Sequence, residues 1–209
     1  MSFNKFCRIY IIRHAETDKN IFKKNNITQI NSLDSSLIFD KNCKLNHTGK
    51  IKAGIVGDYF ASMENNISIV YSSPLIRAVE TADIILKRVG GDVDFSVDER
   101  LFCGKIDKLT GETNLLSDVQ EFIENIVSIY MGYSVILVTH NHIFNIIRKL
   151  YMNDLIPTQE QDCLSQLVSP QQKYKVENCS MSCLQFADTV KIPQINFWAK
   201  HIKVSYSLE

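Results

Sequence analysis

Short, wholly apolar stretches recur along this chain and predict the strands of a buried sheet. Residues 9–12 and 134–139 are the clearest, because β-branched and aliphatic side chains dominate both. Continuous apolar runs of this length are typical of strands covered on both faces, as in a parallel sheet. The remaining candidates are residues 67–71, an edge strand at 93–97, and two late strands at 180–186 and 192–198.

Between these strands, apolar residues follow the spacing of amphipathic helices. Ser72-Ser73-Pro74 predicts a helix start, with a serine cap and a proline in the first turn, and Gly90-Gly91 predicts the end of that helix. Strands that alternate with helices indicate βαβ units and a largely parallel sheet, so the predicted class is α/β. The predicted helices cover residues 48–63 (with Ile51, Ile55, Val56, Tyr59 and Phe60 on one apolar face), 74–89, 115–130 and 141–152.

Three polar connections lack a clear pattern. Residues 20–46 are rich in Asn, Lys, Ser and Asp and predict a long loop, which we take as an insertion at about 21–44. A connection of this length is unusual in a compact domain unless it is functional or disordered. Residues 98–113 are expected to be irregular, and 153–176 give no readable signal. We expect a single domain over residues 1–209.

The overall charge excludes one class of function. Lys plus Arg number 23 and Asp plus Glu number 23, so the formal net charge is zero. A neutral chain without a long basic run is a poor candidate for electrostatic binding to nucleic acid. Any anion site must therefore be a local cluster of side chains.

The apolar stretches and the cysteines indicate the expected cellular location. No apolar run is long enough to span a membrane, and the first residues do not resemble a signal peptide. The six cysteines form no Cys-x-x-Cys pair and have no metal-ligand spacing. We therefore expect reduced thiols, no bound metal and a cytoplasmic protein that does not associate with membranes.

Polar groups of matching chemistry follow three of the predicted strands. Arg13-His14 ends the first, Arg77 follows the second through two serines, and Thr139-His140 ends the third. Ligands of open parallel sheets bind at the carboxyl ends of the strands. If these strands are neighbours, two histidines and two arginines converge on one pocket, where guanidinium groups match phosphate oxygens.

The position of Arg77 gives a second argument for an anion. It lies in the first turn of its helix, where the helix dipole disfavours a cation by roughly 0.3–1 kcal/mol and a bound anion would reverse that effect. Each feature also has a structural interpretation. Arg77 could pair with Glu80, and His140 could be a hydrogen-bonded core histidine.

Several segments resemble the histidine phosphatase superfamily, which includes the phosphoglycerate mutases. Arg13-His14-Ala15-Glu16-Thr17 resembles its Arg-His-Gly-Glu-Thr signature, and Val138-Thr139-His140-Asn141-His142 resembles Val-Ser-His-Gly-Gly. The resemblance covers about residues 8–188 in the family's order. Further similar segments are Leu45-Asn46-His47-Thr48-Gly49, the run from Ser72 to Ala82, Gly111-Glu112-Thr113 and Asn178-Cys179-Ser180.

This resemblance implies a fold and a set of residue roles. The fold would be a phosphoglycerate mutase-like three-layer sandwich, with a mostly parallel central sheet flanked by helices. His14 would be the nucleophile that carries the phosphoryl group, and no cofactor or metal would be needed. The residues expected to bind phosphate are Arg13, Asn20, Arg77, His140 and Asn141. His142 replaces a family glycine and is a further candidate for the pocket.

The resemblance leaves the general acid open. The leaving oxygen needs a proton, normally from a carboxyl group with a raised pKa. In a mutase-like alignment Glu99 is the donor, and this is our prediction. In a phosphatase-like alignment Asp98 anchors the segment and Cys103 falls where the acid should be, so that either Asp107 supplies the proton or the acid has been lost.

The predicted function is hydrolysis of a phosphate monoester through a phosphohistidine intermediate. A mutase that returns the phosphoryl group to its substrate is less favoured, because no adjacent arginines follow the acid and only Lys105, Lys108, Lys173 and Lys175 are available. A third alternative is a non-catalytic phosphate-binding protein. The expected partner is a small phosphorylated substrate or a phosphopeptide.

Overall fold

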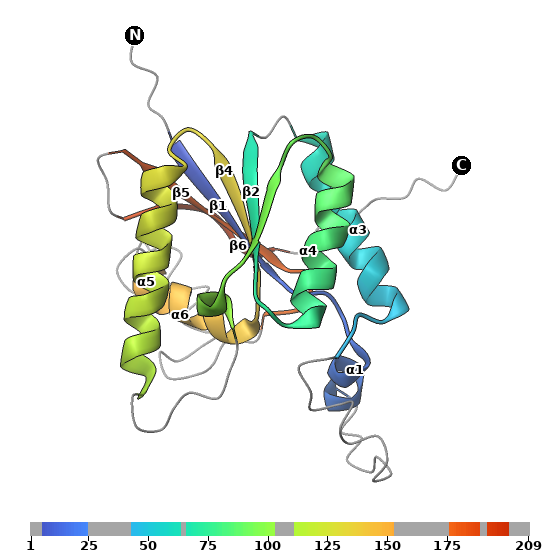
Figure 1. The fold of residues 1–209 in the computed structure, drawn as a ribbon. Helices are drawn as coiled ribbons and strands as arrows, with labels where there is room; N and C mark the ends of the chain where they lie inside the picture. Colours follow the sequence, from blue (N-terminus) through green and yellow to red (C-terminus); the bar gives the residue numbers. More distant parts are fainter. Residues whose placement is uncertain are drawn as a thin grey trace.

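A twisted sheet of six strands forms the centre of the fold (Figure 1). The structure is a computed structural model that describes residues 6–24, 43–63, 66–102, 111–152, 176–188 and 192–200. The strand order across the sheet is β3-β2-β4-β1-β5-β6. The strands are β1 (Phe6–Arg13), β2 (Ile67–Ser72), β3 (Asp94–Val97), β4 (Ser134–Thr139), β5 (Met181–Ala187) and β6 (Gln194–Lys200).

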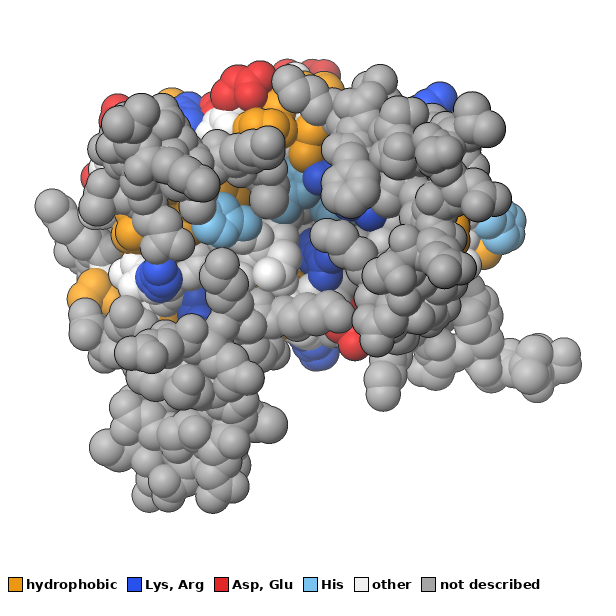
Figure 2. Space-filling view, turned by 90° about the horizontal axis from the view of Figure 1, so that it is seen from below, with side chains coloured by type: hydrophobic (Ala, Val, Ile, Leu, Met, Phe, Trp, Pro, Cys, Tyr) orange, Lys and Arg blue, Asp and Glu red, His pale blue; other side chains and the backbone are white. Residues whose placement is uncertain are grey.

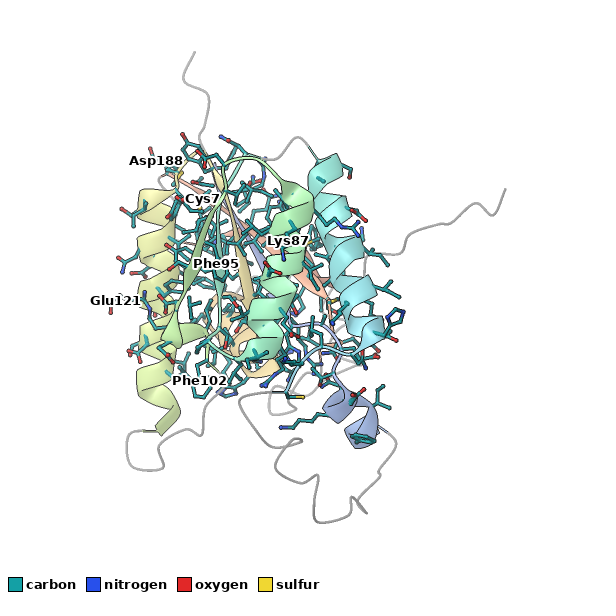
Figure 3. All side chains as sticks on the ribbon, turned by 45° about the vertical axis from the view of Figure 1, so that its right-hand side comes forward. Cys7, Lys87, Phe95, Phe102, Glu121 and Asp188 are labelled. Atoms are coloured by element: carbon teal, nitrogen blue, oxygen red, sulfur yellow. The ribbon has the colours of Figure 1, made fainter. Side chains whose placement is uncertain are left out.

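The sheet is mostly parallel, as predicted. β3, β2, β4 and β1 pair in parallel, whereas β5 pairs with β1 and β6 pairs with β5 in the antiparallel sense. Every residue of β4 is buried, which agrees with its continuous apolar sequence. β3 lies at the edge and is largely exposed, and Figure 3 labels Phe95 on this strand.

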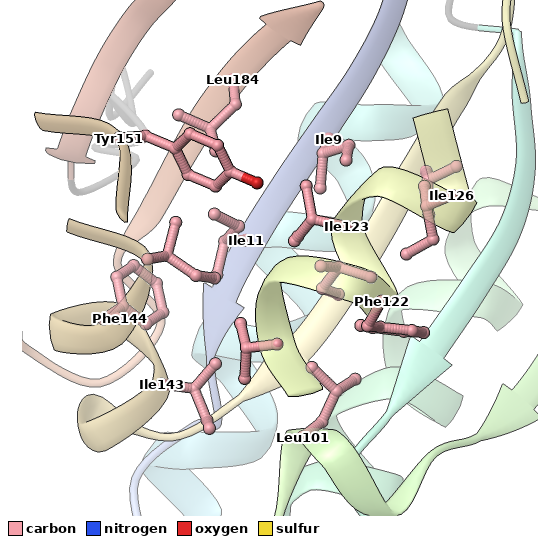
Figure 4. Close-up of a cluster of buried hydrophobic side chains, with 14 of the residues drawn as sticks. Ile9, Ile11, Leu101, Phe122, Ile123, Ile126, Ile143, Phe144, Tyr151 and Leu184 are labelled. Atoms are coloured by element: carbon pink, nitrogen blue, oxygen red, sulfur yellow. The ribbon is translucent and has the colours of Figure 1, made fainter. Parts of the chain in front are cut away.

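Helices cover both faces of the sheet and complete the predicted three-layer sandwich (Figure 1). Because side chains alternate along β1, Ile9 and Ile11 enter one core while Tyr10 and Ile12 enter the other. Figure 4 shows the first core, in which Ile123 lies beside Ile9 of β1 and Phe122 packs against Tyr71 of β2. The helices are α5 (Gly111–Ile129) and α6 (Asn141–Met152) on that face, α3 (His47–Ser62) and α4 (Ile76–Val89) on the other, and the short α1 (Asp18–Lys24).

The predicted start of α4 is wrong by two residues. The helix begins at Ile76 with Leu75 at the N-cap, and leucine has no polar side-chain atom that could cap the helix. The predicted end is confirmed: Gly90 closes the helix with a φ of 68°. Two other helices differ from the prediction. α5 starts at Gly111 rather than at 115, and α1 occupies the beginning of the predicted long loop, of which residues 25–42 lie outside the described residues.

The predicted apolar face of α3 is only partly correct. Ile51 is 49% exposed, and half of the buried positions are glycines. The reason is the close packing of α3 against α4. A Cβ atom on Gly57 would lie 2.6 Å from Cβ of Arg88 and 3.2 Å from the backbone Cα of Ile85, so glycine permits a distance between the helices that a larger residue would not. The buried residues of α3 are Gly49, Ala53, Gly54, Val56, Gly57 and Phe60.

The helices and the cysteines of the described residues are relevant to the predicted cellular location. Among the described residues, no helix is both long and apolar enough to cross a membrane. Four cysteines, including Cys7 at the start of β1 (Figure 3), are buried free thiols. Burial raises the pKa of the Cys7 thiol to about 12, so this thiol is inert at neutral pH. Cys103 and Cys163 lie outside the described residues.

Candidate active site

The candidate residues meet at the end of the sheet where the four parallel strands finish. β2, β4 and β1 are neighbours, so the residues that follow them lie side by side, as the sequence predicts. Figure 2 shows this end of the molecule, with histidine and Lys or Arg side chains gathered near its centre. The structure therefore brings the predicted strand ends together.

His14 follows β1 and is held tightly between the two neighbouring strands. Its backbone N–H donates to the carbonyl oxygen of Thr139 over 2.8 Å, and the preceding N–H of Arg13 donates to Ser180 over 3.1 Å. The imidazole is 5% exposed. The backbone of both adjacent strands thus fixes the ring in a buried position.

The hydrogen bonds of the His14 ring identify its tautomer. Nδ1 lies 2.8 Å from the carbonyl oxygen of Ala15, which can only accept, so Nδ1 carries the proton. Nε2 is then unprotonated, and its lone pair accepts a hydrogen bond from Nε of Arg77 over 3.3 Å. Both contacts agree that Nε2 is the unprotonated atom. The carbonyl of Ala15 is the acceptor that the sequence could not identify.

His140 lies beside His14 and is equally buried. The two ring centroids are 5.1 Å apart, with an angle of 56° between the ring planes. Nε2 of His140 lies 2.8 Å from Oγ of Ser73, at the end of β2. Nδ1 is also buried and has no hydrogen-bond partner among the described residues.

The two arginines place positive charge around these rings. Arg77 is the second residue of α4, so it lies in the first turn of the helix, as predicted. Nη1 of Arg13 donates to the backbone carbonyl of Val176. Glu80, the alternative partner for Arg77, accepts a hydrogen bond from the backbone N–H of Leu45 over 2.7 Å.

Both imidazoles are held neutral. Burial lowers the pKa of His14 well below its usual value, and the charges of His140, Arg77 and Arg13 lower it further, whereas the bond to Ala15 opposes this shift only in part. Burial and the two arginines lower the pKa of His140 to about 3. A neutral imidazole with a free lone pair is the form that can act as a nucleophile.

Asn20 lies on α1, and its side-chain oxygen stabilises the turn that follows His14. Oδ1 accepts from the backbone N–H of Thr17 over 3.0 Å and from the Thr17 hydroxyl over 2.8 Å. A third donor is Nδ2 of Asn178, at 3.2 Å. An amide oxygen cannot donate, so the predicted contact of the Asn20 side chain with phosphate would have to come from its amide nitrogen.

Asn178 is a residue of the site that the sequence reasoning missed. Its Nδ2 lies 2.9 Å from the carbonyl oxygen of His14 and 3.2 Å from that of Ala15, the carbonyl that orients the His14 ring. The next residue, Cys179, has a φ of 60°, which is rare outside glycine. The similarity of Asn178-Cys179-Ser180 to a family segment was the available signal, but it carried no role.

Asn141 and His142 begin α6 directly after His140. Oδ1 of Asn141 accepts from the backbone N–H of Val176 over 2.6 Å, so this oxygen ties the chain at 176 to the start of α6. Only its amide nitrogen can donate to an anion, as for Asn20. His142 is half-buried beside it. Lys173 and Lys175 precede this point and lie outside the described residues.

The candidate acids differ in their surroundings. Glu99 opens the short 3₁₀-helix η1 (Glu99–Leu101) and is exposed, and among the described residues no hydrogen bond or ion pair joins its carboxylate to the histidines or arginines of the site. Asp98 forms an ion pair with Arg100 at 2.6 Å. Burial alone would raise the pKa of Asp98, but the hydrogen bonds and charge of Arg100 together lower it. Asp98 is therefore a poor proton donor.

The other candidate acid, Asp107, belongs to the chain that follows η1. Phe102, labelled in Figure 3 near the same end of the sheet, is the last described residue before 103–110. Asp107, Lys105 and Lys108 lie outside the described residues. Within the described ranges, no three His, Cys, Asp or Glu side chains group closely enough to hold a metal ion.

The geometry agrees with a match to a known family. The family model of the histidine phosphatase superfamily (branch 1) matches residues 9–113, which is half of the chain. This chain belongs to the histidine phosphatase superfamily. A comparison of the sequence with curated proteins gave no match.

Solved structures with the superfamily's fold are similar over nearly the whole chain. A phosphoglycerate mutase from Bacillus anthracis str. Sterne has a TM-score of 0.64 at 15% identity, covering 95% of each chain. A mycobacterial glucosyl-3-phosphoglycerate phosphatase in complex with VO3 has a TM-score of 0.59 at 16% identity, covering 91% of this chain and 98% of its own. The protein histidine phosphatase SixA in complex with tungstate has 0.51 at 13%, covering 91% and 94%. At such identities the similarity shows the fold, which is the predicted phosphoglycerate mutase-like one.

Proposed function

We propose that the protein is a phosphomonoesterase that hydrolyses a phosphate monoester through a phosphohistidine formed at Nε2 of His14. The observation that carries the proposal is the pair of contacts on the His14 ring. The Ala15 carbonyl holds the proton on Nδ1, and the Nε2 lone pair faces the guanidinium of Arg77. A nucleophilic lone pair beside a cation is suited to attack on an anionic phosphoryl group.

The reaction has two balanced steps. In the first, the lone pair of Nε2 forms a P–N bond, the ester P–O bond breaks, and the leaving oxygen takes a proton from the general acid. The proton on Nδ1 of His14 stays in its bond to Ala15, which stabilises the positive charge of the phosphorylated ring. In the second step, water forms a new P–O bond, the P–N bond breaks, and the acid regains its proton from that water.

The phosphate-binding roles rest on charge and position. Arg77 and Arg13 each act electrostatically on both imidazoles, so both guanidinium groups are near the reacting atoms. We propose that Arg13, Arg77 and His140 bind the phosphoryl oxygens, with the amide groups of Asn20 and Asn141 as further donors. Each charge-assisted contact of this kind contributes roughly 10²–10³-fold to the rate in comparable sites.

Glu99 remains the proposed general acid. However, its carboxylate is exposed and has no described contact with the site. This observation favours the alternative function, a protein that binds phosphate without catalysis. A Glu99→Gln variant distinguishes the two. If Glu99 is the donor, the variant loses activity toward alkyl phosphates, whose leaving groups need a proton, far more than toward aryl phosphates, whose leaving groups need little help.

The test of the proposal is the hydrolysis of para-nitrophenyl phosphate by the wild type and by His14→Ala. The matched control is His47→Ala, because His47 is an exposed histidine at the start of α3. We expect His14→Ala to lose about 10³-fold or more in turnover and His47→Ala to lose nothing. Acid-labile radioactive phosphate on the wild-type protein, absent from His14→Ala, would identify the intermediate. Equal turnover of the wild type and His14→Ala would refute the proposal.

A second assay separates hydrolysis from phosphoryl transfer. The wild type is incubated with 3-phosphoglycerate, and both free phosphate and 2-phosphoglycerate are measured. A phosphatase releases phosphate without accumulating the isomer, whereas a mutase forms the isomer faster than it releases phosphate. The substrate class that we propose is a small phosphate ester or a phosphopeptide, and a panel of such esters tests it.

A further inference from the structure

We propose that the hydroxyl of Ser73 is a positioning group that fixes the tautomer of His140, so that Nδ1 of His140 presents a proton to the bound phosphoryl group. This inference rests on the proposed function for its role in turnover, but the tautomer itself can be measured without any activity. It assigns a task to a residue for which the sequence suggested only a helix cap.

The hydrogen bonds of Ser73 indicate which way its hydroxyl proton points. Its side chain is completely buried, and Oγ has two neighbours: Nε2 of His140 at 2.8 Å and the backbone N–H of Leu75 at 3.4 Å. The N–H of Leu75 can only donate, so Oγ accepts there. The hydroxyl proton of Ser73 then has Nε2 of His140 as its acceptor among the described residues.

The tautomer of His140 with its proton on Nε2 is less favourable. If Nε2 of His140 carried the proton, it would donate to Oγ, and the buried hydroxyl proton of Ser73 would have no acceptor among the described residues. The lone pair of Nδ1 would also lack a partner within the described ranges, so this tautomer leaves two buried polar groups unpaired, whereas the tautomer with the proton on Nδ1 leaves only that proton unpaired and is therefore favoured. Since His140 is neutral, only one of its nitrogens carries a proton, and that nitrogen is Nδ1.

Nδ1 of His140 is available to a bound ligand. Nδ1 is a buried polar atom for which the described residues offer no hydrogen-bond partner. The ring lies between Ser73 and His14, because β4 separates β2 from β1 in the sheet. An N–H that finds no acceptor in the protein is suited to an acceptor on the ligand, and the phosphoryl oxygens supply one.

The two histidines therefore share a tautomer but use opposite nitrogens. In His14, the Ala15 carbonyl holds Nδ1–H, and the Nε2 lone pair is the reactive atom. In His140, the Ser73 hydroxyl holds the Nε2 lone pair, and Nδ1–H is the hydrogen-bond donor. One ring attacks phosphorus and the other binds its oxygens, although both are neutral.

The test is ¹⁵N NMR of histidine-labelled protein at pH 7.5 without phosphate, with the His140 signals assigned through a His140→Gln variant. In the wild type we expect Nε2 of His140 to have the chemical shift of an unprotonated ring nitrogen and Nδ1 that of a protonated one. In Ser73→Ala we expect the two tautomers to mix. A wild-type His140 protonated at Nε2 would overturn the inference, as would the same tautomer in both proteins.

A binding measurement gives an independent readout, with inorganic phosphate as the probe. We expect Ser73→Ala to bind phosphate about three- to tenfold more weakly than the wild type, because only the fraction of His140 that keeps the proton on Nδ1 can donate to phosphate. The control is Ser182→Ala, which removes another buried hydroxyl, on β5, that accepts from the backbone N–H of Ala199. We expect this control to bind phosphate within twofold of the wild type. An unchanged phosphate affinity in Ser73→Ala, combined with an inactive His14→Ala, would overturn the role of Ser73 while the phosphatase proposal stands.

Discussion

Replacing Gly49 with alanine tests how the loop after His14 is held in place. Gly49 is near the start of α3, where its backbone N–H donates to Oδ1 of Asn46 over 2.8 Å. A Cβ atom at this position would lie 2.1 Å from the carbonyl oxygen and 2.9 Å from the backbone nitrogen of Glu16. These neighbours are backbone atoms, so a side-chain rotation cannot relieve the contact.

The distances set the size of the effect. Nonbonded heavy atoms separate to about 3.4 Å or more, so the backbone of α3 and that of Glu16 must move apart by about 1 Å. This movement weakens the bond from the Asn46 N–H to the Glu16 carbonyl, at 3.1 Å, and the ion pair of Lys52 with Glu16, at 3.0 Å. Overpacking costs about 1–3 kcal/mol and a lost hydrogen bond about 1 kcal/mol, whereas alanine gains about 0.5–1 kcal/mol in a helix. The expected net loss is about 1–3.5 kcal/mol of the free energy of unfolding.

Activity should fall as well, because Glu16 follows the carbonyl that orients the His14 ring. A displacement of about 1 Å at a reacting group can cost roughly 10²-fold in turnover. The assays are urea denaturation, read by circular dichroism, and hydrolysis of para-nitrophenyl phosphate under conditions where the variant is fully folded. We expect a lower urea midpoint and a lower kcat in Gly49→Ala.

Gly54→Ala is the matched control on the same helix. Among the described residues, a Cβ atom at this position would meet only the side chain of Arg88, with Nη2 at 3.5 Å and Cζ at 3.8 Å, which are ordinary contacts. This variant should be as stable as the wild type or more stable by about 0.5–1 kcal/mol, with unchanged turnover. If Gly49→Ala has the stability and turnover of Gly54→Ala, the close contact between α3 and the His14 loop is not what the structure indicates.

Three further predictions follow from the site. The pKa of His140 is lowered to about 3, against an ordinary value of 6.5, so below pH 6.5 the unfolded chain binds a proton that the folded protein excludes. The free energy of unfolding should therefore decrease as the pH falls below 6.5, by roughly 1 kcal/mol per pH unit. This dependence on pH should be weaker in His140→Gln. Asn178→Ala removes the donor to the carbonyls of His14 and Ala15, so kcat should fall about tenfold with little change in KM. The control Asn196→Ala, at an exposed position of β6, should have the kcat and KM of the wild type. A change in KM alone in Asn178→Ala would contradict this role. Incubation with EDTA followed by gel filtration should leave phosphatase activity unchanged, and loss of activity restored by a divalent cation would show that the two-histidine mechanism is incomplete.

Local sequence patterns were sufficient for the architecture. The apolar run at 134–139 predicts a strand covered on both faces, and β4 is buried at every position in the centre of the sheet. Gly90 ends α4 as predicted, because only a residue without a Cβ readily adopts its left-handed φ. The sequence made the convergence of Arg13, His14, Arg77 and His140 conditional on the three strands being neighbours, and the order β2-β4-β1 in the sheet meets that condition.

The tertiary structure decided the features that depend on contacts between distant segments. The sequence placed Ile51 in the core, but α3 packs through glycines against α4, and a periodic pattern contains no information about that distance. It also read Ser73 as a helix cap, although the serine contacts His140, 67 residues further along the chain. The tautomer of each histidine, and hence the nitrogen that can act on phosphorus, is set by one carbonyl and one hydroxyl. A sequence motif specifies that a histidine is present, but the hydrogen-bond partner of each ring nitrogen depends on positions accurate to a fraction of an ångström, which only the packed fold defines.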